Sequence, residues 1–270
     1  MATKRTKKKS SRDIDSADIE ARIFDVSKGS PYVRLLAYAR NGVGKTRLGA
    51  SFPDPLIIDI NEEGTRSAEK GKVFPAKTWS DIAAIYWYLQ KGDHPYETVV
   101  IDTITQMQVL AMRRTMKEKE ERDPEADPKQ PRIQDYGKAN TMMGEMLLMF
   151  RNLPMHVVFL AQERIVGDAE EGELEVAMPD LPNGSRKHAM GAVGIIGRLY
   201  QREVKDKNTK KTKWAVCMLV GPHEEYETKD RTNNLGRIVL NPTGDKIIKA
   251  WNHKNEPGTT TKRRRKRGNA

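Results

Sequence analysis

The sequence predicts an α/β fold in which a mainly parallel, twisted sheet is flanked by helices, and three observations lead to this prediction. Short apolar runs that are typical of buried strands alternate with longer segments that have helical periodicity. A glycine-containing loop, NGVGKT, joins the first strand pattern to the first helix pattern. The C-terminal part contains further strand patterns, which we expect to add antiparallel strands to the sheet.

The elements are expected to follow one another from Tyr32 onward, strand and helix in turn. Strands are predicted at 33–37, 56–60, 98–101 and 155–161, and helices at 46–51, 80–90, 105–119 and 140–151. Because the strands are separated by crossover helices, we expect them to be parallel. Later strands are predicted at 195–204, 214–220, 237–240 and 246–250, with a basic turn at 205–213.

Two segments do not have the periodicity of a strand or a helix. Residues 117–138 are rich in charges and prolines, which predicts an exposed, mobile insertion. Residues 164–187 are acidic at first, then contain prolines, and end with basic residues. For this second segment two interpretations stay open: an irregular segment that a ligand orders, or a surface hairpin.

The distribution of charge divides the chain into three regions. The 270 residues carry a net charge of +11, and the basic residues at 4–9 and 262–267 together account for all of it. We therefore expect a basic arm and lead-in at 1–30, one domain at 31–253 that is large enough for a buried core, and a basic tail at 254–270. Basic ends on a neutral body favour a polyanionic partner, with solubility or nuclear import as alternatives.

The loop after the first strand has the pattern of a phosphate-binding loop. Successive backbone N–H groups at a strand-to-helix turn can surround a β-phosphate. Lys45 is then expected to reach the β- and γ-phosphate oxygens, and Thr46 to hold Mg²⁺. Ala39 stands at the first position, where the full pattern has glycine. The residues expected to bind the triphosphate are Ala39, Arg40, Asn41, Gly42, Val43, Gly44, Lys45 and Thr46.

Carboxylates at the ends of two other strands complete the predicted nucleotide site. Asp102 ends the buried strand VVID and is expected to act at the metal, or else only to cap the next helix. Thr103 follows it, so a water-activating carboxylate must come from elsewhere. Glu63, with Glu62 in reserve, is the candidate general base, although either can also be a solvated loop charge.

Three further polar residues are candidates for contact with the γ-phosphate. Gln162 follows the strand at 155–161, and the carboxyl edge of a parallel sheet is where ligands bind. Lys229 and Arg231 lie in a late loop, ETKDRT, from which cations can reach the γ-phosphate of a neighbouring subunit. The alternative for this pair is an ordinary exposed charged turn.

Other features narrow the class of protein. The chain has one cysteine, Cys217, so it can form no intramolecular disulfide and no zinc site built on several cysteines. No run approaches the roughly 20 apolar residues that a membrane span needs. We expect a soluble, intracellular protein without a membrane partner.

Five stretches together resemble the RecA-core phage ATPases of the Sak single-strand annealing group: YARNGVGKT, YETVVIDTIT, VVFLAQE, PDLPNG and ETKDRTNNLG. The resemblance covers roughly residues 32–251. It implies a RecA-like P-loop NTPase fold, ATP and Mg²⁺ as cofactors, and single-stranded DNA as a partner. It also implies a homo-oligomer, either a filament or a ring, that promotes annealing in the host cytoplasm, with a single-strand DNA-binding protein as a candidate further partner.

The same resemblance assigns roles to the late polar residues. In the wider RecA family the glutamine that ends this strand senses the γ-phosphate and passes that state to a DNA-binding loop. By likeness, Gln162 and the segment 164–187 take these parts, while Lys229 and Arg231 act in trans. Either that segment or the basic ends are expected to contact DNA. A nucleotide-dependent DNA-binding or loading module with negligible turnover is the alternative.

Overall fold

A computed structural model describes Glu20, Ile23 and residues 29–60, 64–123, 127, 130–167, 174–205 and 212–253. The chain divides into two units. One consists of the two ends, 1–31 and 254–270, of which only Glu20, Ile23 and 29–31 are described. The basic arm and lead-in predicted at 1–30 therefore lie mostly outside the described residues. The other unit spans 32–253 and contains all the elements that follow.

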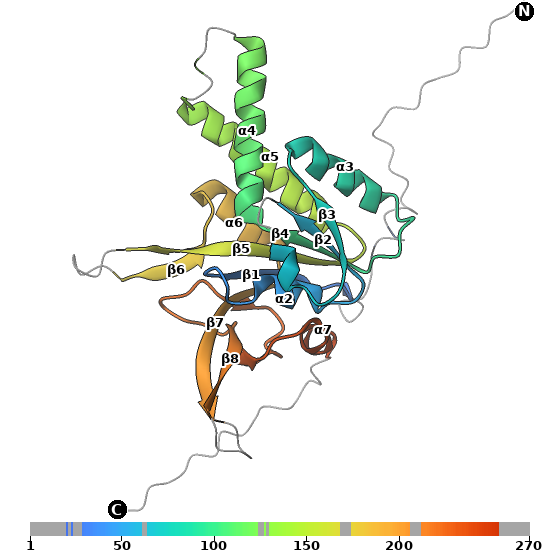
Figure 1. Cartoon of the computed structure of the whole chain (residues 1–270), viewed down its shortest axis with the longest axis vertical. Helices are drawn as coiled ribbons and strands as arrows, with labels where there is room; N and C mark the ends of the chain where they lie inside the picture. The colour runs from blue at the N-terminus through green and yellow to red at the C-terminus, as the bar shows by residue number, and fades with distance from the viewer. Residues whose placement is uncertain are drawn as a thin grey trace, which may run out of the picture. The chain divides into compact units, whose positions relative to one another are not determined.

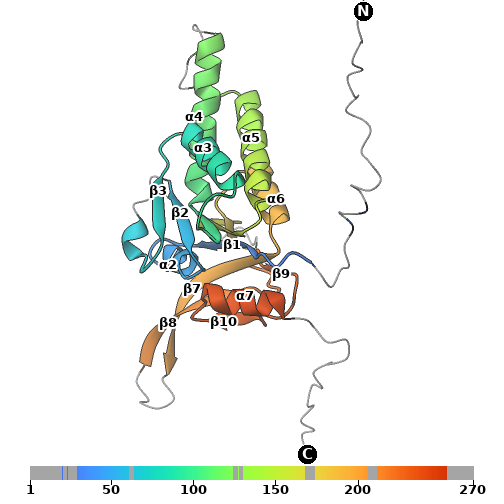
Figure 2. The same cartoon turned by 90° about the vertical axis from the view of Figure 1, so that its right-hand side faces the viewer.

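A large sheet organises the second unit, with the strand order β10-β8-β7-β1-β5-β4-β2-β3. Figure 1 shows its strands from β8 to β3, and β10 is labelled in Figure 2. β1 pairs in parallel with β5 and β7, β4 with β5 and β2, and β2 with β3. β8 pairs antiparallel with both β7 and β10. The predicted fold class is confirmed. The strand bounds are β1 Arg34–Ala39, β2 Pro55–Asp59, β3 Lys72–Pro75, β4 Thr98–Asp102, β5 His156–Val166, β6 Val176–Pro179, β7 Ile195–Lys205, β8 Thr212–Leu219, β9 Lys229–Asp230 and β10 Ile238–Leu240.

Helices cover both faces of the sheet (Figure 2). α3, α4, α5 and α6 pack on one face, and α2 and α7 on the other. The helix bounds are α2 Lys45–Ala50, the 3-10 helix η2 Gly64–Ser67, α3 Trp79–Gln90, α4 Ile104–Arg122, α5 Ile133–Arg151, α6 Asn183–Ala192 and α7 Gly244–Asn252.

The alternation of side chains along β1 creates two cores. Leu36 and Tyr38 pack toward α3–α6, whereas Leu35 and Ala37 pack toward α2 and α7. All four are fully buried. A strand that is apolar at every position is what a parallel sheet covered on both faces requires. This is why the continuous apolar runs were sufficient to predict the central strands.

The strand predicted at 246–250 is wrong, because α7 occupies this segment. Thr243 caps the helix by accepting a hydrogen bond from the Lys246 N–H. Asp245 lies in the first turn, where its negative charge interacts favourably with the positive end of the helix dipole. Ile247 is fully buried, and Ile248 and Trp251 pack against the same core. This spacing is helical, but the segment is short enough to be read as a strand.

The insertion predicted at 117–138 is also largely wrong, since α4 and α5 extend into it from both sides. Ion pairs join the two helices there. Glu118 pairs with Lys138, and Lys119 Nζ lies 3.1 Å from Asp135 Oδ2. High charge suggested a segment without structure, but in this case opposite charges face one another on neighbouring helices.

The irregular segment predicted at 164–187 contains regular structure in most of its described part. β5 continues to Val166, β6 returns antiparallel beside it, and α6 begins at Asn183. The surface hairpin that the sequence left open as the alternative is therefore what forms. The acidic residues at 168–173 lie outside the described residues.

Close packing of α2 on β4 requires glycine at position 49. A Cβ at Gly49 would lie 2.6 Å from Cγ1 of Val100, which is fully buried. We expect Gly49→Ala to lower the free energy of unfolding by about 1–3 kcal/mol, measured by urea denaturation. Gly137→Ala, in an exposed position of α5 where an added Cβ meets no atom within 4 Å, should instead raise it by up to about 1 kcal/mol. Equal unfolding free energies for the two variants would contradict this packing.

Candidate nucleotide-binding site

The loop between β1 and α2 turns through two glycines with left-handed backbone conformations. Gly42 has φ 77° and Gly44, immediately before α2, has φ 111°. A side chain at either position would strain the backbone, so the sequence NGVG specifies this turn. Ala39 does not take part in the turn, because it is still the last residue of β1. A glycine is therefore not needed at position 39 for the loop to form.

The ammonium group of Lys45 lies at the centre of the loop. Lys45 Nζ donates hydrogen bonds to the carbonyl oxygens of Ala39, at 3.1 Å, and Arg40, at 3.2 Å, and to Gln162 Oε1, at 3.0 Å. The lysine is 7% exposed. The loop thus holds a buried ammonium group beside its own N–H groups, a position from which it can attract a phosphate.

Thr46 and Asp102 meet beside this lysine. Thr46 Oγ1 donates to Asp102 Oδ2 at 2.6 Å, and both residues are buried. Gly64 of η2 faces the pair, because a Cβ there would lie 3.1 Å from Thr46 Oγ1 and 3.6 Å from Asp102 Oδ2. A hydroxyl and a carboxylate with space kept open by glycine fit the oxygen donors that Mg²⁺ prefers.

A cavity of about 1250 Å³ opens over the loop. Its wall on one side comes from η2 and the residues after it, and on the other side from β7, β8 and the residues before α7. Besides residues 41–48, the lining includes Gly64, Arg66, Lys70, Asp102, Gln201, Val216, Asn241, Pro242 and Thr243. The second wall could not be predicted from the sequence, because strands distant in sequence meet the loop only in the folded sheet.

Gln162 is held in place by its own backbone. In the register of the sheet it lies opposite Ala39, where β1 ends. Its N–H donates to Thr105 Oγ1 at 3.0 Å, and its carbonyl oxygen accepts from the Asp180 N–H at 2.8 Å. Gln162 therefore connects Lys45 to the start of α4 and to the segment after β6.

Glu163, the residue directly after Gln162, forms a buried ion pair that was not predicted from the sequence. The Arg198 guanidinium bonds Glu163 through both oxygens, at 2.6 and 3.2 Å, and Arg40 Nε of the loop lies 3.4 Å from Glu163. The Glu163 side chain is only 1% exposed. The charged ER pair after an apolar strand was the sole signal in the sequence, and it does not reveal the partner on β7.

Lys229 and Arg231 lie near the amino-terminal ends of β1 and β7, whereas the loop lies at the carboxyl-terminal end of β1. The N–H of Arg231 donates to the Gly194 carbonyl, and the Gly194 N–H donates to the carbonyl of Arg34, the first residue of β1. The loop begins at the opposite end of that strand, roughly 16 Å away for six residues. Lys229 and Arg231 are therefore not brought together with Lys45 within one chain.

Lys229 has a partner of its own in this position. Its Nζ donates to the Met190 carbonyl oxygen at 2.6 Å. Burial, and then the nearby charge of Arg231, lowers the pKa of Lys229. The remaining candidates, Glu62 and Glu63, lie outside the described residues.

Fold and site together define a P-loop nucleotide-binding protein: a parallel sheet, a glycine-turned loop, a buried lysine, and a threonine paired with the aspartate of a neighbouring strand. The sequence profile of the family described as AAA domain matches residues 32–232. The chain belongs to this family, whose members are generally P-loop ATPases. It matches no curated protein. Among the described residues, no helix has the length and apolar character to cross a membrane.

The buried pair after Gln162 yields a test of how the strand end is held. Because Arg198 would keep its charge without a counter-charge, we expect Glu163→Gln to lower the free energy of unfolding by about 3 kcal/mol. Urea denaturation measures this change. Glu203→Gln, at an exposed glutamate of the strand that carries Arg198, is the control and should change it by less than about 0.5 kcal/mol. A Glu163→Gln variant as stable as this control would show that the pair does not anchor β5.

Proposed function

We propose that this protein binds and hydrolyses ATP with Mg²⁺ and uses the reaction in single-strand annealing on DNA during phage recombination. The observation that carries the proposal is the convergence of Lys45, Thr46 and Asp102 at the end of β1 and β4. Membership of the AAA domain family supports nucleotide binding. The resemblance to the Sak group supports the DNA substrate and the phage origin.

The described residues would share the work at the triphosphate. The N–H groups of the loop and the Lys45 ammonium would bind phosphate oxygens and offset the charge that develops on them. Thr46 and Asp102 would hold Mg²⁺, which would supply positive charge to the triphosphate. Glu63 or Glu62 would orient and deprotonate the attacking water.

Gln162 would report whether the γ-phosphate is present. The side-chain oxygen of Gln162 accepts a hydrogen bond from the Lys45 ammonium, and a phosphate oxygen would compete with it for that ammonium. A released amide would turn toward the phosphate. The backbone carbonyl of Gln162 accepts a hydrogen bond from the Asp180 N–H. A movement of Gln162 would therefore be transmitted to the segment between β6 and α6.

Lys229 and Arg231 would act on a neighbouring subunit rather than on their own pocket. Their place at the amino-terminal edge of the sheet supports this, because the loop lies at the carboxyl edge. A cation supplied in trans would stabilise the charge of the transition state. The proposed assembly is therefore an oligomer, either a filament or a ring, in which the next subunit completes each site.

A second candidate is a nucleotide-dependent DNA-binding or loading module that turns ATP over negligibly. The observation that favours it is Thr103 directly after Asp102, a position that many P-loop ATPases fill with a catalytic glutamate. In that case ATP would set assembly and DNA affinity without a hydrolytic cycle.

Steady-state hydrolysis with and without single-stranded DNA separates the two candidates. For an annealing ATPase we expect DNA to raise kcat, and Lys45→Ala to lower kcat by about 100-fold or more, because a preorganised charge at the γ-phosphate is removed. Lys91→Ala, an exposed lysine after α3, is the control and should leave kcat unchanged. Hydrolysis that is equal with and without DNA would contradict the annealing ATPase.

The basic ends generate a separate expectation for DNA affinity. Replacing the six basic residues 262–267 by glutamine should reduce the salt dependence of single-strand binding, by about 0.7 in slope for each phosphate that is no longer neutralised. Fluorescence anisotropy at several salt concentrations measures this slope. Glutamine at the exposed Lys91, Lys117 and Lys249 is the control, with the slope of the wild type expected. An unchanged slope in the first variant would show that this end does not bind DNA.

A further inference from the structure

β7 and β8 extend beyond the sheet as a two-stranded ribbon (Figure 1). β7 pairs with β1 at Ile195–Arg198, and from Leu199 to Lys205 it is paired with β8. The outer part of the ribbon is therefore supported by its own ladder rather than by the central strands. Nothing in the proposed nucleotide chemistry requires this extension.

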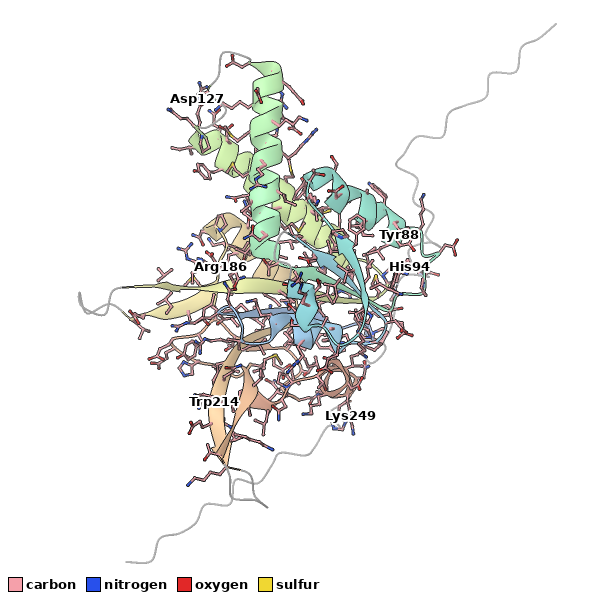
Figure 3. All side chains as sticks on the ribbon, viewed as in Figure 1. Tyr88, His94, Asp127, Arg186, Trp214 and Lys249 are labelled. Carbon is pink, nitrogen blue, oxygen red and sulfur yellow. The ribbon has the colours of Figure 1, made fainter. Side chains whose placement is uncertain are left out.

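The ribbon carries Trp214, a residue that is 68% exposed (Figure 3). Trp214 lies opposite Glu203 in the ladder, and Val216 lies opposite Gln201. Residues two apart on a strand share a face, so Trp214 lies on the same face as Val216 and Gln201, which line the nucleotide cavity. The indole is about 7 Å further out along that face.

The outer ribbon carries more exposed positive than negative charge. Lys205 lies on the face of Trp214, where Glu203 is directly opposite the indole, and Arg202 and Lys213 are exposed on the reverse face. Glu203 is the one acidic residue among 201–205 and 212–216. An indole costs free energy when it is left in water, and a ribbon with net positive charge disfavours a positively charged partner. An exposed aromatic side chain on a basic ribbon favours single-stranded nucleic acid, which binds through base stacking and phosphate contacts.

We propose that the outer β7–β8 ribbon binds single-stranded DNA, with a base stacked on Trp214 and a phosphate contacted by Lys205 on the same face. Arg202 and Lys213 would contact further phosphates where the strand passes the edge of the ribbon to its reverse face. This inference rests on the proposed function, because it assigns a surface to the DNA that the function requires. The surface differs from the basic ends and from the segment 164–187. Duplex DNA fits less well, since its bases are already stacked on one another.

The same ribbon connects this surface with the nucleotide. A Cβ at Gly44 of the phosphate loop would lie 3.9 Å from Cγ2 of Val216, so β8 packs directly beside the loop. A nucleotide in the cavity would therefore contact the strand whose outer end holds the DNA. Any change that a bound nucleotide makes in the affinity of the ribbon for DNA must be matched by an equal change that DNA makes in the affinity for nucleotide, because linkage is reciprocal.

Anisotropy of a fluorescein-labelled oligothymidylate, titrated with the full-length protein, tests this inference. Trp214→Ala should raise Kd by about 5- to 150-fold, the equivalent of one stacked base, and Trp214→Phe should recover most of the affinity. Trp87→Ala is the matched control, since Trp87 is 57% exposed on α3 and lies on the sheet face that α3–α6 cover. This control should keep the Kd of the wild type.

A second pair of variants tests the charges. Lys205→Glu with Lys213→Glu should weaken binding and reduce its salt dependence, whereas Lys91→Glu with Lys117→Glu, on the other face of the sheet, should change neither. All four residues are exposed, so these variants decide the question even if Trp214→Ala fails to fold.

The outcomes separate the two proposals. If the wild type binds the oligonucleotide and the ribbon variants bind as tightly, the ribbon inference is wrong while the proposed function stands. If the wild type itself does not bind, the DNA part of the proposed function fails first. If Trp214→Ala reduces particle size in light scattering without a change in Kd, the ribbon is a contact between subunits, and the inference is overturned.

Discussion

The parallel register of β1, β5 and β4 determines which side chains meet at the phosphate-binding loop. β5 lies between β1 and β4, so Gln162 comes to lie beside the end of β1, and Asp102 one strand further along the same edge. A slip of one residue in either pairing would turn the following side chain to the other face of the sheet. The contacts of Lys45 with Gln162 and of Thr46 with Asp102 exist because the two cores fix this register.

Hydrogen bonds connect the nucleotide site to the helices α4, α5 and α6, which cover one face of the sheet. Asp180, held by the Gln162 carbonyl, lies just before α6. Ser185 of that helix joins a buried polar cluster, in which its Oγ lies 2.6 Å from Gln108 Oε1 and 3.0 Å from Asn140 Oδ1. Polar groups buried in this way are costly to separate, so α4, α5 and α6 are expected to move as one body.

The sequence was sufficient for the elements whose local pattern agrees with their environment, and insufficient where tertiary contacts decide. The continuous apolar strands and the glycines at 42 and 44 carry their own signal, so β1, the loop and Asp102 were predictable. The ion pairs between α4 and α5 were not, because paired and solvated charges look alike in sequence. The same applies to Glu163, whose partner on β7 is 35 residues away.

Calorimetric titration with a non-hydrolysable ATP analogue measures the nucleotide site independently of turnover, DNA and assembly. We expect one nucleotide to bind per chain, with an affinity that falls when Mg²⁺ is removed. Thr46→Val should lose this dependence on Mg²⁺, since the hydroxyl beside Asp102 is absent. The absence of binding, or binding by the wild type that is indifferent to Mg²⁺, would contradict this expectation.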